Sequence, residues 1–139
     1  MMKWLNCKCF DKASDWAPLV LRLSAGLVFV AHGWQKYGAM VAFGDFLDSL
    51  GVPLPGLFAG VVVAVEIIGG AALILVLFTH WAAKLLALDM LAAFFLFHWS
   101  NGVFVQNNGY ELVLLLFTAS FAVTVLGAGK WSLDKMFWK

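Results

Sequence analysis

The chain has 139 residues, of which 63% are hydrophobic and 12% are charged, and its formal net charge is +1. A soluble domain is about one-quarter charged, so these few charged residues cannot cover a water-facing surface and a lipid environment is expected. The near-neutral charge and the lack of a basic cluster in the sequence exclude nucleic acid as the expected partner.

Four apolar runs are long enough to cross a bilayer, because a spanning helix needs about 20 residues. They cover approximately residues 17–36, 56–79, 81–99 and 110–128. Lipid offers no hydrogen bonds to the backbone, so each run is expected to be a helix. The connections are too short for a second domain. We therefore predict one all-α domain over residues 1–139, a bundle of four transmembrane helices.

The residues before the first span contain no apolar run, so we interpret that span as a retained transmembrane helix rather than a signal peptide. Cys7 and Cys9 form a C-x-C sequence in this tail. Disulfides are rare on the cytoplasmic side of a membrane. Two reduced thiols are therefore expected, with transient metal or redox chemistry as the alternative.

The first span carries one polar stripe. At about 100° per residue of α-helix, Arg22, His32 and Lys36 fall within roughly 80° of one another. Gly26 and Gly33 share that face, and glycines allow a neighbouring helix to approach closely. This stripe is expected to face the interior of the bundle.

Between the first two spans, apolar side chains recur at helical spacing: Met40, Phe43, Phe46, Leu47 and Leu50. This pattern predicts a short amphipathic helix in the membrane interface, which Pro53 and Pro55 bring to an end. The segment is either a packing lid or a gate over a site between the helices.

Glu66 lies near the middle of the second span, on one face with Gly69 and Gly70. Counted at about 1.5 Å per residue, Arg22 and Asp89 lie near the same depth. We therefore predict a buried charge cluster in which Arg22 holds Glu66, and Asp89 is a second acidic partner or a competitor. Because charges inside a membrane are expensive, a proton-carrying or ligand-gripping site is the alternative to structural pairing between helices.

A second polar set lies at the outer ends of three helices: His32, Lys36, His98 and Glu111. In an ideal helix, Asp89 points well away from His98. The histidines could bind a transition metal, but the sequence has no local pair of ligands and we predict no metal site. We expect a pocket between the first, third and fourth helices, opening outward beneath the amphipathic segment.

Lysines gather in both tails: Lys3, Lys8, Lys12, Lys130, Lys135 and Lys139. The connections 38–55 and 102–109 contain neither lysine nor arginine. Because positive residues favour the cytoplasmic side of a membrane, both termini are expected in the cytoplasm.

Five stretches form an ordered set of motifs: HGWQK at 32–36, GVPLPG at 51–56, EIIGGAALIL at 66–75, HWSNGVFVQNNGYELVLLL at 98–116 and LGAGKWSLDKMF at 126–137. Together they resemble the DoxX family, over nearly the whole chain from about Leu19 to Phe137. The polar positions of the family match seven residues here: Arg22, His32, Lys36, Glu66, His98, Asn101 and Glu111. Asp89 matches none of them.

DoxX proteins are similar to the small membrane subunits of thiosulfate:quinone oxidoreductases, and members are linked to membrane complexes that handle thiol and oxidative stress. The resemblance implies a bacterial or archaeal plasma-membrane subunit that binds quinone or supports a redox partner. The candidate quinone-binding residues are His32, Lys36, His98, Asn101 and Glu111. The sequence has no haem, flavin or iron–sulfur motif, so electrons would come from other membrane or redox subunits. A structural anchor subunit and a small proton or solute transporter that self-associates are the alternatives.

Topology is tested by labelling single cysteines in intact cells with a membrane-impermeant thiol reagent. Ser100→Cys and Asn107→Cys are expected to react from outside, because the connection that holds them lacks positive charge. Native Cys7 is expected to react only after the membrane is opened. The reverse accessibility would contradict the predicted orientation.

Overall fold

A computed structural model of the protein describes residues 16–127 and 129. The described chain folds into five α-helices: α1 (Ala17–Gly38), α2 (Met40–Ser49), α3 (Pro55–Leu75), α4 (Thr79–Ala93) and α5 (Glu111–Leu126). The all-α prediction is confirmed, and the short helix expected between the first two spans is α2. Helix α4 continues through a π-helical turn, Phe94–His98, and a 3-10 turn, Trp99–Asn101.

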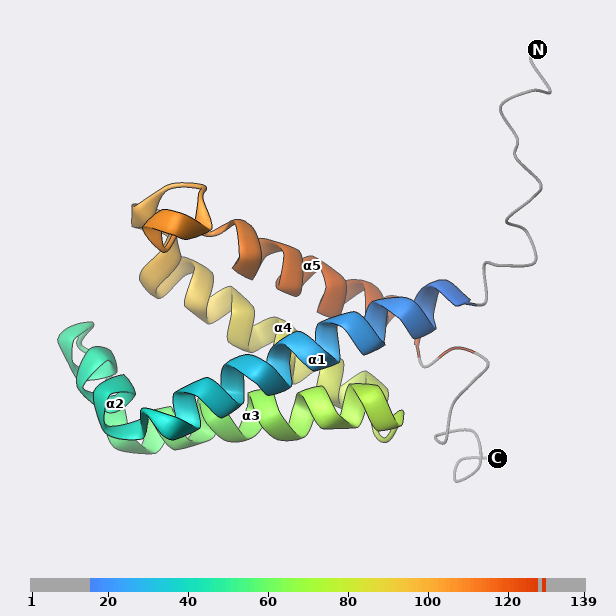
Figure 1. The fold of residues 1–139 in the computed structure, drawn as a ribbon, viewed down its shortest axis with the longest axis horizontal. Coiled ribbons are helices and arrows are strands. Elements are labelled where there is room, and N and C mark those ends of the chain that lie inside the picture. Colours follow the sequence, from blue (N-terminus) through green and yellow to red (C-terminus); the bar gives the residue numbers. More distant parts are fainter. Residues whose placement is uncertain (1–15, 128, 130–139) are drawn as a thin grey trace, which may run out of the picture.

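The helices pack as two layers (Figure 1). Helices α1 and α3 lie side by side and antiparallel, and α4 and α5 form a second antiparallel pair that packs against them. The start of α1 and the end of α5 lie at one end of the bundle, whereas α2 and the α4–α5 connection lie at the other. Between the layers, Phe29, Leu73, Leu86 and Val123 are fully buried.

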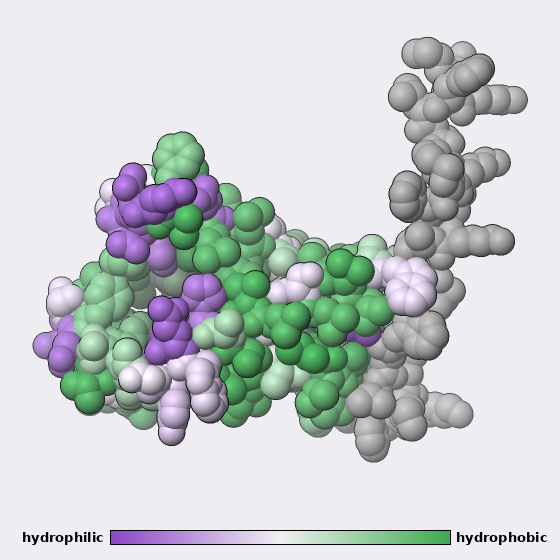
Figure 2. Space-filling view, in the orientation of Figure 1, coloured by the Kyte–Doolittle hydropathy of each residue, from purple (hydrophilic) through white to green (hydrophobic). Residues whose placement is uncertain are grey.

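Three helical segments are long and apolar enough to cross a membrane: Ala17–Gly38, Pro55–Leu75 and Thr79–Asn101. Helix α5 is apolar but shorter, with 16 residues, so its role as a fourth span stays a prediction. The outer surface of the bundle is largely apolar, and hydrophilic residues gather near α2 and the α4–α5 connection (Figure 2). Large apolar side chains with more than half of their surface exposed occur on every long helix, among them Leu27, Ile68, Leu88 and Leu115. Such a surface suits lipid rather than water.

Helix α3 ends at Leu75, four residues before the end of the predicted span at residue 79. Val76 and Phe78 adopt left-handed backbone conformations, with φ of 59° and 49°, and turn the chain into α4. Glycine or proline normally marks such a turn. Here the residues of the turn are apolar like those before it, so the sequence pattern did not indicate that α3 ends at Leu75.

The contact between α1 and α3 depends on glycine. A Cβ atom added at Gly26 would lie 2.7 Å from the carbonyl oxygen of Gly70, and one added at Gly70 would lie 2.8 Å from the oxygen of Gly26. Seven residues further along α1, or about two helical turns, a Cβ at Gly33 would lie 2.7 Å from Ile67 Cγ1. The two backbones therefore touch directly, which fixes how far one helix is shifted along the other.

Alanine substitutions within α3 test this contact. In Gly70→Ala the new methyl group meets backbone atoms of α1 that cannot rotate away, and overpacking of this kind costs about 1–3 kcal/mol. Gly60→Ala is the matched control, because nothing lies within 4 Å of its added Cβ. We expect Gly70→Ala to lower the melting temperature in mild detergent and Gly60→Ala to leave it equal or slightly higher. Equal melting temperatures for the two variants would contradict the proposed close contact.

Candidate functional site

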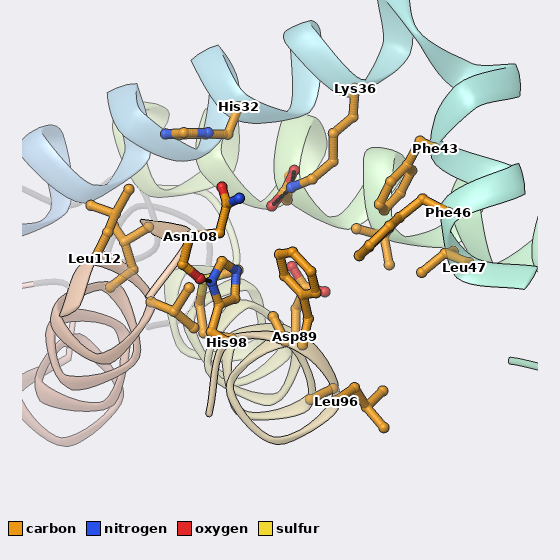
Figure 3. A pocket seen from close by; sticks show the side chains of 18 of the residues that line it. His32, Lys36, Phe43, Phe46, Leu47, Asp89, Leu96, His98, Asn108 and Leu112 are labelled. Atoms are coloured by element: carbon orange, nitrogen blue, oxygen red, sulfur yellow. Dashed lines mark hydrogen bonds and ion pairs between the residues drawn. The ribbon is translucent and has the colours of Figure 1, made fainter. Parts of the chain in front are cut away.

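A cavity of about 500 Å³ lies between α1 and α4, beneath α2 and the α4–α5 connection (Figure 3). Its polar lining comes from His32, Lys36, Glu66, Asp89, His98 and Asn108. Its apolar lining includes Phe43, Phe46, Leu96, Phe97, Leu112 and Val113. The cavity therefore joins one strongly polar wall to aromatic and aliphatic walls.

The polar wall is built around an ion pair between α1 and α3. Lys36 Nζ donates hydrogen bonds to both carboxylate oxygens of Glu66, at 2.6 and 2.7 Å (Figure 3). The Glu66 side chain is 1% exposed and that of Lys36 is 29% exposed, so the pair lies at the edge between bundle interior and cavity. An ammonium group has three N–H donors. Two of them bond to Glu66, which leaves one directed elsewhere.

The predicted pairing of Glu66 with Arg22 is wrong. Among the described residues, the ion pair of Glu66 is with Lys36. The glycine contacts place Glu66 opposite Gly33, which is 11 residues from Arg22, or about 16 Å along α1. Arg22 is fully buried near Gly129, at the other end of the bundle. Depth counted from the end of each helix does not include the register of α1 against α3, and this register decides which side chains meet.

Asp89 belongs to the same polar wall. Its side chain lines the cavity from α4, across from His32 and Lys36 on α1 (Figure 3). The Oδ2 atom is buried and has no hydrogen-bond partner among the described residues. The carboxyl group interacts electrostatically with Glu66 and Lys36. One lysine thus faces two carboxyl groups, so Asp89 is a competitor of Glu66 for a cation, but the cation is Lys36 rather than Arg22.

The π-helical turn explains why Asp89 and His98 line the same cavity. Nine residues of ideal α-helix would place them on opposite faces, as the sequence suggested. A π turn holds more residues per turn than an α turn, and such turns are frequent at functional sites. Each residue of the π turn therefore rotates less about the helix axis than an α-helical residue does, so Phe97 and His98 lie closer to the side of Asp89 than an ideal α-helix would place them.

Two of the predicted site residues hold the α4–α5 connection rather than line the cavity. Glu111 Oε1 accepts a hydrogen bond from the backbone N–H of Val105 at 2.7 Å. Asn101 Nδ2 donates to the carbonyl oxygen of Phe97 at 3.1 Å. His98 also fixes this connection, since its Nδ1 lies 2.6 Å from the carbonyl oxygen of Asn108. Three predicted residues, His32, Lys36 and His98, therefore meet at the cavity, and Asn101 and Glu111 support its rim.

Helix α2 covers one side of the cavity with the apolar face that its sequence predicted. Phe46 packs edge-on against Phe97, with ring centroids 4.6 Å apart. The ring of Phe43 lies 5.6 Å from Lys36 Nζ, a distance at which a cation is attracted to an aromatic face. Helix α2 is thus fastened both to the π turn and to the ion pair.

His32 and His98 line the same cavity. Within residues 16–127 and 129, however, no group of three histidine, cysteine or acidic side chains is arranged to hold a metal ion. The site is therefore described by its ion pair, its second carboxyl group and its aromatic walls.

Sequence reasoning separated an inner charged cluster from an outer polar set, and the structure merges them, because Lys36 of the outer set binds Glu66 of the inner one. Asn108 was not predicted from the sequence. It lines the cavity and has a left-handed backbone with φ of 60°. The N-N-G sequence at 107–109 is typical of a turn and could have indicated this position.

The apolar spans and the buried charges between them define a multi-pass integral membrane protein. The chain belongs to the DoxX family, whose sequence profile matches residues 17–99. This confirms the resemblance seen in the motifs.

Several relatives are similar to the chain over most of its length. A Bacillus subtilis (strain 168) protein named "Putative oxidoreductase CatD" is 31% identical over 114 residues, which are 82% of this chain and 83% of the relative. An uncharacterised protein of Haemophilus influenzae is 35% identical over 86% of this chain and 89% of its own. The Escherichia coli (strain K12) protein named "Inner membrane protein YqjF" is 26% identical over 90% of this chain and 95% of its own. No solved structure matches the chain at a significant level.

Removal of Lys36 tests the ion pair. Lys36→Met leaves Glu66 buried without its cation, and breaking a buried pair in this way costs about 3–5 kcal/mol. We expect a loss near the lower end of that range, because Lys36 is partly exposed, measured as unfolding free energy in detergent at alkaline pH. The double variant Lys36→Met with Glu66→Gln is expected to recover most of the loss, since residue 66 then carries no buried charge.

Lys84→Met is the matched control for this substitution. Its Nζ lies 4.8 Å from the Trp81 ring centroid, an interaction worth about 0.5–1 kcal/mol at an exposed site. Lys36→Met is therefore expected to be clearly more destabilising. Equal losses in the two variants would show that the Lys36–Glu66 pair contributes no more than the contact of Lys84 with Trp81.

Proposed function

We propose that the protein is a quinone-linked subunit of a membrane oxidoreductase complex, and that the cavity between α1 and α4 binds the quinone head group. The observation that carries this proposal is the composition of the cavity. The cavity has a volume of about 500 Å³, and its lining includes aromatic side chains, the Lys36–Glu66 pair and Asp89. Most small-molecule sites are of this size, with apolar walls and a few placed polar groups.

The chemistry of a quinone fits these walls. Its flat ring needs an apolar slot, which Phe43, Phe46 and Phe97 supply. Its two carbonyl oxygens need hydrogen-bond donors, and the remaining N–H of Lys36 and the imidazoles of His32 and His98 are within the cavity lining. A lipid-soluble ligand also suits a site between helices that face the bilayer.

Reduction of a quinone to a quinol takes two electrons and two protons. The electrons would come from the redox group of a partner subunit. The protons require acids near the ring, and proton transfer by a positioned side chain is a common catalytic device. The cavity offers two carboxyl groups and two histidines for this purpose. The name of the Bacillus subtilis relative, an oxidoreductase, supports the redox class of the proposal.

A structural subunit that anchors a larger membrane complex is the second candidate. A shallow groove of about 400 Å³ between α1 and α5 favours it. The groove is lined by several small side chains: Ser24, Ala25, Ala119 and Ala122. Small residues at a helix surface permit close approach of another helix within a membrane.

Ligand binding to the cavity is tested with decylubiquinone, a short-chain benzoquinone. A ligand that binds only the folded state stabilises it by about 2.7 kcal/mol at 100 times its dissociation constant, so the melting temperature of the parent protein in detergent is expected to rise. Ala92→Trp places an indole at the cavity wall and is expected to remove most of that rise. Ala64→Trp is the control: Ala64 is exposed on α3 and does not line the cavity.

The outcomes separate the candidates. No stabilisation of the parent protein by decylubiquinone would contradict quinone binding, and full stabilisation of Ala92→Trp would place the ligand elsewhere. Purification in mild detergent adds a second readout. Bound quinone supports the redox subunit, whereas a partner enzyme without any bound lipid-soluble ligand supports the structural one.

A further inference from the structure

Asp89 is an acidic side chain for which the pairing in the cavity gives no partner. The two oxygens of Glu66 hold the ammonium group of Lys36. The Oδ2 atom of Asp89 is buried and accepts no hydrogen bond from any described residue, although the side chain lines an open cavity. A buried polar atom without a partner costs free energy, and the cost is larger for a charged carboxylate than for a neutral carboxyl group.

The charges that face Asp89 are few. Helix α1 contributes His32 and Lys36, α3 contributes Glu66, and the extension of α4 contributes His98. Helices α2 and α5 line the cavity with apolar side chains, among them Phe43, Phe46, Leu112 and Val113. Among the described residues that line the cavity, the lysine is Lys36, and it is already bound to Glu66. An ionised Asp89 would thus be a second negative charge in an apolar setting without a cation of its own, which is unfavourable.

A neutral carboxyl group has an O–H donor, whereas a carboxylate only accepts. We propose that Asp89 is the residue that recognises the ligand, and that in its neutral form it donates a hydrogen bond to a carbonyl oxygen of an uncharged, lipid-soluble ligand. This inference rests on the proposed quinone-binding function and names the contact that selects the ligand. The chemical class is a carbonyl compound with a flat apolar body. It would lie between Asp89 on α4 and Lys36 on α1, whose side chains both line the cavity (Figure 3).

The affinity for the carbonyl ligand is expected to depend on pH in a defined direction. Once Asp89 ionises at high pH, its donor is lost and its charge repels the carbonyl oxygen. Affinity for a carbonyl ligand therefore falls as pH rises, by about tenfold per pH unit above the ionisation. A lipophilic cation would show the opposite trend, because it would bind more tightly to a cavity with an ionised Asp89.

The experiment measures the affinity of the protein in detergent for decylubiquinone across a range of pH, from the shift in melting temperature. Asp89→Asn keeps an N–H donor and cannot ionise, so it is expected to bind with nearly constant affinity. Asp89→Leu has the same branching of heavy atoms as aspartate but no donor, and is expected to bind more weakly than Asp89→Asn at every pH. A pH trend that persists in Asp89→Asn would belong to another group of the cavity and would overturn the assignment.

A second measurement follows the carboxyl group without ligand. Infrared spectra of the parent protein at neutral pH are expected to show the carbonyl stretch of a protonated carboxylic acid, and Asp89→Asn is expected to lack it. Absence of this band in the parent protein would overturn the neutral Asp89, whether or not a quinone binds.

The two proposals fail in different ways. If decylubiquinone binds the parent protein and Asp89→Leu equally well, quinone binding stands and the role of Asp89 falls. If decylubiquinone does not bind the parent protein at any pH, both fall. Stabilisation by tetraphenylphosphonium that grows with pH, and is lost in Asp89→Asn, would replace the carbonyl ligand by a cationic one.

Discussion

The direct contact between the backbones of α1 and α3 sets the position of everything else in the bundle. Gly26 and Gly70 face each other with no room for a side chain, and Gly33 packs against the turn that carries Glu66. Because these contacts fix the register, Glu66 lies one turn from Lys36 and far from Arg22. The ion pair is thus a consequence of small residues that carry no charge.

The ion pair in turn determines the character of the cavity. A carboxylate within a membrane is held at a cost unless a cation accompanies it, and Lys36 is long enough to reach Glu66 from the helix end while part of its surface stays open. Asp89 then shares a cavity with a pair that is already satisfied. The protein keeps an acidic group beside an open space, which is an arrangement typical of a binding site rather than of packing alone.

The shape of the cavity comes from two irregularities. The π turn at Phe94–His98 rotates the end of α4 so that Phe97 and His98 face the same space as Asp89. Helix α2 closes that space from above through the contact of Phe46 with Phe97. The polar groups of the α4–α5 connection, Asn101 and Glu111, hold the rim by hydrogen bonds to the backbone. A regular four-helix bundle would have neither the opening nor the helix that covers it.

The sequence by itself determined the helical class, the apolar spans, the amphipathic segment and the inward face of the first helix. These follow from composition and from local periodicity, which act within one helix at a time. It also singled out Lys36, Glu66 and Asp89, because charges in apolar runs are rare. The motifs pointed to the DoxX family.

Only the tertiary structure decided which of these charges meet. Pairing depends on the shift of one helix along another, and a shift of a few residues moves a side chain past its partner without any change in the periodicity of either helix. The backbone contact at Gly26 and Gly70 sets that shift, and the π turn at Phe94–His98 sets the rotation of the end of α4. Both depend on packing between segments distant in the chain, so counting along each helix separately could not reveal them.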